Sequence, residues 1–155
     1  MSIIAAIDPG VKGAIALFDR RDLADVIDMP LARHVGWAHS IPDALVIRSL
    51  FDNWGVERVI IETIQPRPGN GMSAVAASAV SWGILLGVCH DIRLEAVTPQ
   101  KWTKALGVGS DKGAHRAAAR NLFGGNLFDR VKDDGRADAA LIGHYWLTSR
   151  QEVAA

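Results

Sequence analysis

The sequence has little of several things that would mark other protein classes. It contains one cysteine, one tyrosine and six prolines in 155 residues, and its 17 basic and 17 acidic side chains cancel. The lone Cys89 cannot form an internal disulfide, which is typical of a reducing compartment and predicts a cytoplasmic protein. No apolar run reaches the roughly 18 residues of a membrane span, and no secretory signal is apparent at the start. We therefore expect neither a disulfide-stapled secreted domain nor a membrane protein.

The composition is that of one ordinary globular domain. Apolar residues make up 49% and charged residues 22% of the chain. A chain of this length can bury a core without disulfides or structural metal. We therefore expect a single domain over residues 1–155.

The neutral total hides a basic segment. Residues 93–120 carry six basic side chains and only two acidic ones, whereas residues 1–62 are acidic on balance. A local positive field suits a polyanionic partner such as nucleic acid. The alternative is a solvated helix face with scattered charges.

The order of apolar periods and turn signals predicts an α/β domain. Strands are expected at 2–8, 14–18, 23–29, 56–62 and 93–97. Helices are expected from Pro42 to Gly55 with Ser40 as a possible cap, over 72–88, from Pro99 to Gly107, over 111–123 and over 134–149. The short turns between the first three strands indicate antiparallel neighbours, and the later strands are joined through helices. The prediction is a five-stranded mixed sheet, three antiparallel strands followed by two parallel ones, with helices on both faces. The small, apolar 72–88 segment is expected to be well buried and is also a candidate subunit contact.

Four acids stand at the ends of these elements. Asp8 and Glu62 each close an apolar strand, while Asp134 and Asp138 are spaced i, i+4 at the start of the last helix. Carboxylates brought together repel one another, and a divalent cation such as Mg²⁺ or Mn²⁺ removes that cost. The alternative treats Asp8-Pro9 as a turn and Asp134 as a helix cap. Because all four acids fall on suitable elements, we favour a metal site.

Four segments of the sequence, taken together, resemble a known family. The matching segments, in order, are Ile7-Asp8-Pro9-Gly10 with Gly13, Val59-Ile60-Ile61-Glu62, Ala96-Val97-Thr98-Pro99 and Ala137-Asp138-Ala139-Ala140. Together they resemble the RuvC family of Holliday junction resolvases, which has the RNase H-like fold. The resemblance implies a homodimeric, Mg²⁺-dependent endonuclease of a bacterium or phage that nicks two strands of a four-way DNA junction symmetrically. It implies Mn²⁺ as a substitute, and Asp8, Glu62 and Asp138 as metal ligands.

The sequence departs from the family pattern in two places. The family commonly has its fourth ligand three residues before the last acid, and here that position is Gly135. Asp134 is the expected replacement, with Asp133 as its competitor. The loop after the second acid often carries an aromatic residue, but residues 65–71 contain none.

Basic residues near these acids are candidates for binding DNA. They are Lys101, Lys104, Lys112, Arg116 and Arg120, together with Arg67 in the loop. Lys112, Arg116 and Arg120 succeed one another at one-turn spacing, which suits contacts to backbone phosphates. Nearby, His115 is a candidate for a further phosphate contact, and Trp102 is expected in the core with a DNA contact as the alternative.

Other classes of protein share parts of this pattern. A sugar-kinase or actin-type ATPase also has an acid and glycines after its first strand, but it needs a duplicated domain that 155 residues do not provide. An RNase H-like nuclease for RNA–DNA hybrid or structured RNA stays an alternative. So does a catalytically weakened module that binds branched DNA, because of Gly135.

Overall fold

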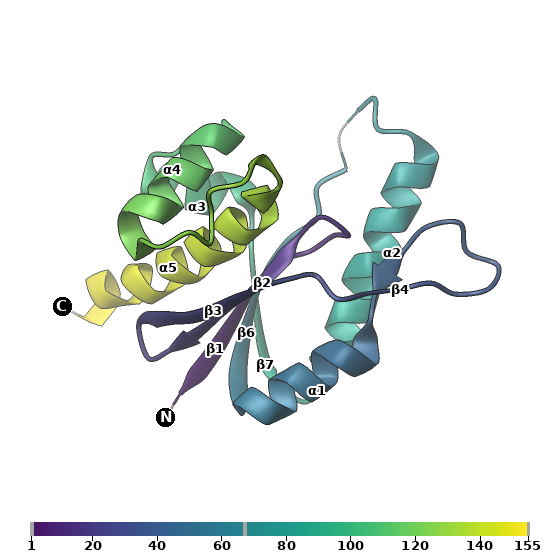
Figure 1. Cartoon of the computed structure of the whole chain (residues 1–155), viewed down its shortest axis with the longest axis horizontal. Coiled ribbons are helices and arrows are strands. Elements are labelled where there is room, and N and C mark those ends of the chain that lie inside the picture. The colour runs from purple at the N-terminus through teal and green to yellow at the C-terminus, as the bar shows by residue number, and fades with distance from the viewer. Residues whose placement is uncertain (1, 67, 155) are drawn as a thin grey trace.

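The computed structural model describes residues 2–66 and 68–154, with side chains as far as Arg150. Its centre is a five-stranded sheet in the order β3-β2-β1-β6-β7 (Figure 1). The strands are β1 (Ile3–Asp8), β2 (Ala14–Asp19), β3 (Asp22–Asp28), β6 (Val56–Glu62) and β7 (Arg93–Val97). The first three are antiparallel neighbours, whereas β6 and β7 run parallel to β1. The predicted mixed α/β sheet is therefore confirmed.

Helices cover both faces of the sheet. They are α1 (Ala44–Trp54), α2 (Met72–Val88), α3 (Pro99–Leu106), α4 (Lys112–Phe123) and α5 (Asp134–Ala154), with the 3-10 turn η1 (Val131–Asp133) just before α5. Helices α1 and α2 lie on one face, and α3, α4 and α5 lie on the other (Figure 1). None of the helices within the described residues is long and apolar enough to cross a membrane.

The alternation of side chains along β1 separates the two layers of the core. Ile3, Ala5 and Ile7 pack with α1 and α2, whereas Ile4 and Ala6 pack with α3, α4 and α5. Successive side chains in a strand point to opposite faces, so Asp8 falls on the same face as Ile4 and Ala6. The strand thus delivers its terminal carboxylate to the α5 side of the sheet.

One predicted helix start is wrong. Pro42 does not open a helix, because Ile41–Pro42 forms strand β5 and pairs with β4 (Leu31–Ala32). The cap of α1 is Asp43 instead of Ser40. Its side chain accepts hydrogen bonds from the backbone N–H groups of Leu45 and Val46, both at 3.1 Å. A proline in a short edge strand needs no backbone donor, so the hairpin tolerates it.

Helix α2 is the second correction. It has the predicted bounds, but it is not well buried: its buried residues are Ser81, Leu85 and Val88 out of 17. Composition predicted burial, yet this chain supplies little to cover the helix.

Candidate active site

The carboxyl ends of β1 and β6 bring the first two acids together. The strands are parallel neighbours, and Ile7 is in register with Ile61. Asp8 and Glu62 follow these two residues, so their side chains stand beside each other at one edge of the sheet. A cavity of about 230 Å³ adjoins Glu62, and it is lined in part by Pro9 and Thr63.

Helix α5 brings the third acid to the same place. Asp138 is 3% exposed, and its charge raises the pKa of both Asp8 and Glu62. Burial is the largest cause of the raised pKa of Asp8, and repulsion by Asp138 and Glu62 adds to it. Burial also raises the pKa of Glu62, partly offset by a hydrogen bond from Trp102. Three carboxylates from three elements thus share one small, poorly solvated region.

Two basic side chains of α4 contact Asp138. Lys112 Nζ donates to Oδ2, and His115 Nδ1 lies 2.6 Å from Oδ1. Burial alone would lower the pKa of Lys112, but the bond to Asp138 and the attraction of Asp8 and Glu62 raise it. The hydrogen bond to Asp138 likewise raises the pKa of His115, against the effect of burial. Among these three acids, Asp138 is therefore the one that two basic side chains contact directly.

The remaining predicted ligand lies apart from this group. Asp134 begins α5 and forms an ion pair with Arg116. It lines a different cavity, with Lys12 and Asp28 among its neighbours. Its competitor Asp133 is 1% exposed, and both of its oxygens accept hydrogen bonds from Arg130. The structure brings together Asp8, Glu62 and Asp138 and gives Asp133 and Asp134 arginine partners.

A steric contact explains why position 135 is glycine. A Cβ built there would lie 2.2 Å from the carbonyl oxygen of Lys12 and 2.8 Å from the Cα of Gly13. The turn after β1 therefore presses its backbone against α5 at this point. A ligand side chain at 135 would have to displace that turn.

The predicted DNA-binding residues divide into two sets. In α4, Lys112 faces Asp138, Arg116 faces Asp134, and Arg120 Nη1 lies 3.8 Å from an Asp129 oxygen. The one-turn spacing therefore aligns them, but each has an acidic neighbour. Arg67 lies outside the described residues.

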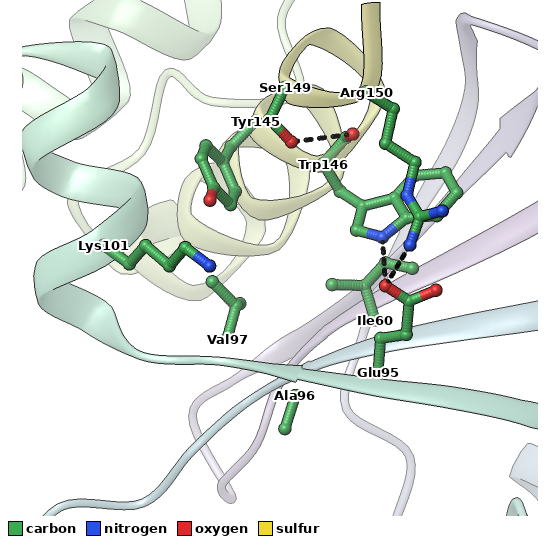
Figure 2. A pocket seen from close by; sticks show the side chains of 9 residues that line it. All are labelled: Ile60, Glu95, Ala96, Val97, Lys101, Tyr145, Trp146, Ser149 and Arg150. Atoms are coloured by element: carbon green, nitrogen blue, oxygen red, sulfur yellow. Dashed lines mark hydrogen bonds and ion pairs between the residues drawn. The ribbon is translucent and has the colours of Figure 1, made fainter. Parts of the chain in front are cut away.

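Lys101 and Lys104 lie elsewhere, in grooves between α3 and α5. Figure 2 shows Lys101 pointing into a pocket of about 490 Å³ beside Val97 and Tyr145. Lys104 lines an adjoining pocket of about 500 Å³. Neither pocket is the cavity beside Glu62, so a DNA contact by these lysines stays a prediction.

The carboxylate oxygens of Asp8, Glu62 and Asp138 are ligands of the kind that suits a hard divalent cation. In the described parts of the chain, however, no group of three or more acidic, histidine or cysteine side chains is arranged to hold a metal ion. Asp138 has both oxygens engaged, by Lys112 and His115. The donor set fits Mg²⁺ in its chemistry only, and Asp8, Glu62 and Asp138 would hold the ion if Lys112 gave up its bond to Asp138.

Sequence reasoning missed two residues of this site. Trp102 was expected in the core and is 1% exposed, but its Nε1 also donates to Glu62 Oε1 at 2.7 Å. His115 was considered for a phosphate contact, yet it is 3% exposed and faces Asp138. The available signal for His115 was its position three residues after Lys112, which places both on one helix face.

Comparison with known proteins identifies the fold. No family model matches the sequence, and no curated protein matches it. Among solved structures, Thermus thermophilus RuvC in complex with a Holliday junction substrate matches with a TM-score of 0.69 and 13% identity, over 97% of this chain and 96% of that one. A second Thermus thermophilus RuvC structure has a TM-score of 0.61 and 16% identity, over the same shares. The yeast mitochondrial Holliday junction resolvase Ydc2 has a TM-score of 0.67 and 16% identity, over 99% of this chain and 80% of that one. This chain therefore has the RNase H-like fold of the RuvC resolvases.

Proposed function

We propose that this protein is a divalent-metal-dependent endonuclease that resolves four-way DNA junctions by paired nicks. The observation that carries the proposal is the convergence of Asp8, Glu62 and Asp138, whose charges act on one another at the ends of β1 and β6. Burial of Asp8 and Glu62 beside Asp138 raises the pKa of both and costs stability, so the group is a candidate functional site. The RuvC fold and the junction bound to one of its structural neighbours support the choice of substrate.

Each acid has a distinct place in the proposed site. Burial and the charges of Asp138 and Glu62 raise the pKa of Asp8, against the charge of Lys112, so its carboxylate would gain from a bound cation. Glu62 has one oxygen engaged by Trp102 and one left over. Bound Mg²⁺ would stabilise the charge that develops on the scissile phosphate. Lys112, 54% exposed, would then contact a DNA phosphate in place of Asp138.

The homodimer implied by paired nicks has support from α2. The helix is composed of small and apolar residues, of which 8 are exposed and 6 are half-buried. A Cβ built at Gly83 or at Gly87 would meet no atom within 4 Å, so the fold of one chain does not require glycine there. Small residues on an uncovered apolar helix suit close packing against a second copy. We propose that α2 forms the dimer contact.

A substrate panel tests the activity. Labelled four-way junction, linear duplex and RNA–DNA hybrid are incubated with the protein in Mg²⁺, in Mn²⁺ and in EDTA. Symmetric nicks in the junction alone, absent in EDTA, are expected. Cleavage of the hybrid instead would favour the RNase H-like alternative, and junction binding without cleavage in either metal would favour a binding module.

Sedimentation equilibrium tests the dimer. The wild-type chain is expected to sediment as a dimer, and Gly83→Arg as a monomer that keeps the wild-type circular dichroism spectrum. Glu57→Arg, an exposed change on β6 away from α2, is the matched control. A wild-type monomer at all concentrations that support cleavage would contradict the dimer.

A further inference from the structure

Glu62 and Asp138 are linked through two aromatic side chains. Trp102 Nε1 donates to Glu62 Oε1 at 2.7 Å, and His115 Nδ1 lies 2.6 Å from Asp138 Oδ1. The two rings contact each other edge to face, with centroids 5.1 Å apart and an interplanar angle of 62°. One continuous path therefore runs from a strand-end acid to a helix acid through α3 and α4.

Both rings are held too deep to touch a substrate. Trp102 is 1% exposed and His115 is 3% exposed. His115 is also fixed at its other nitrogen, since Nε2 lies 3.0 Å from the carbonyl oxygen of Gly109. A carbonyl oxygen only accepts hydrogen bonds, so Nε2 carries a proton and the ring orientation is set. These side chains therefore act on the acids and not on DNA.

We propose that Trp102 and His115 are positioning residues, which hold Glu62 and Asp138 at the proposed cation site by binding one oxygen of each. The proposal rests on the proposed function, because it concerns the same carboxylates. Each acid then keeps its second oxygen, Glu62 Oε2 and Asp138 Oδ2, for a cation. The Oδ2 of Asp138 is now bound by Lys112, whose half-exposed side chain can leave, whereas the buried His115 stays.

The positioning is needed because the acids repel one another. Without donors on their outer oxygens, rotation of either side chain would separate the charges. Gly135 provides no fourth ligand, so the three acids have to be held more closely to one geometry. Hydrogen bonds to ligand side chains contribute roughly 10- to 100-fold in metal affinity in characterised metal sites.

Calorimetric titration with Mn²⁺, without DNA, is the test. Trp102→Phe keeps the ring and removes the N–H, and His115→Leu removes both ring nitrogens. We expect each to weaken Mn²⁺ binding by about 10- to 100-fold and to lower kcat, with junction binding in EDTA unchanged. His115→Asn, which keeps a donor at the place of Nδ1, is expected to restore most of the affinity. Trp146→Phe is the matched control, because its indole N–H bonds to Glu95 at 2.9 Å.

The outcomes separate this inference from the proposed function. Wild-type Mn²⁺ affinity in both Trp102→Phe and His115→Leu would overturn the positioning role while leaving the nuclease intact. A wild-type protein that binds no Mn²⁺ and cuts no junction would end the proposed function itself. If His115→Leu fails to fold, as judged by urea unfolding, Trp102→Phe decides the question, and wild-type Mn²⁺ affinity in that variant would overturn the positioning role.

Discussion

Acids gather in two regions of this molecule, and the two regions supply them with cations differently. Near the start of α5, Arg136 donates to Asp28 at 2.6 Å and 3.0 Å, and this bond lowers the pKa of Asp28. Burial would raise the pKa of Asp133, but the hydrogen bonds from Arg130 outweigh it and lower that pKa. Each acid there has an arginine of its own.

The other region lies at the ends of β1 and β6. There burial and mutual repulsion hold the pKa values of Asp8 and Glu62 above their usual range, and Lys112 offsets only part of this. We call an acid matched when an arginine is bonded to it, and under-matched when burial and repulsion raise its pKa. Ionisation of an under-matched acid costs stability, and the charge of a bound cation would offset that cost. Both kinds of acid lie on one face of one sheet, and the five predictions below test the proposal that only the under-matched ones are functional.

The largest expected effect is on cleavage. Asp8→Asn is expected to reduce junction cleavage by about a hundredfold or more, because it removes a proposed ligand of the cation that would stabilise the charge on the scissile phosphate. Asp134→Asn, the matched change in the arginine-paired region, is expected to stay within about tenfold of wild type. Single-turnover cleavage of a labelled junction measures both. Equal losses in the two variants would place Asp134 in the site and contradict the comparison.

The next effect is stabilisation by metal. Mn²⁺ at 100 times its dissociation constant is expected to stabilise the wild-type protein by about 2.7 kcal/mol, which thermal unfolding records as a rise in Tm. The same titration of Asp138→Asn should produce little change, since a proposed ligand has lost its charge. A full metal-induced rise in that variant would exclude Asp138 as a ligand.

Removing a matched charge should destabilise the fold. Asp133→Asn is expected to lower the free energy of unfolding by about 1–2 kcal/mol, because a buried side chain loses charged hydrogen bonds to an arginine that solvent partly screens. Urea unfolding at pH 7 is the measurement. An unchanged midpoint would show that Arg130 contributes nothing net.

The same change from Asp to Asn should have the opposite effect on the free energy of unfolding at the ends of β1 and β6. Asp8→Asn is expected to raise the unfolding free energy of the metal-free protein, because it removes a carboxyl group whose ionisation is opposed by burial and by the nearby acids. The sign follows from linkage. An acid with a raised pKa binds more protons when folded, so its ionisation lowers stability as pH rises from the unfolded pKa through the folded one. Destabilisation by Asp8→Asn in EDTA would refute the under-matched description.

The smallest effect concerns DNA binding. Lys112→Ala is expected to weaken junction binding and to reduce the slope of log K against log salt by about one unit, if Lys112 contacts one phosphate. Fluorescence anisotropy at several salt concentrations in EDTA measures this. An unchanged slope would mean that Lys112 stays with Asp138 when DNA binds.

Much of the fold could be predicted because its signals are local. The bounds of β6, α2 and β7 agree with the expected 56–62, 72–88 and 93–97, since periodicity and turn residues mark them directly. Ser40 and Pro42 misled because the pairing of Ile41–Pro42 with Leu31–Ala32 is a contact between separate segments. The predicted burial of α2 was wrong for a related reason: apolar composition favours a covering surface, but the described part of this chain fully buries only 3 of the 17 residues of the helix.

The candidate site divides in the same way. The structure brings together Asp8, Glu62 and Asp138, which were predicted from their positions at element ends, and their role as metal ligands stays a prediction. Asp134 was chosen on its helical spacing from Asp138, but the packing of α4 against α5 gives it Arg116. Spacing along one helix says which residues share a face and nothing about what lies opposite.

By itself the amino-acid order determined that β1 and β6 each end in a carboxylate on one face, because side-chain alternation in a strand is a property of the backbone. Only the tertiary structure decided which acids receive an arginine, which remain under-matched, and that Trp102 and His115 bind two of them. These pairings depend on how α3, α4 and α5 pack on the sheet, and a local sequence pattern does not specify contacts between distant segments.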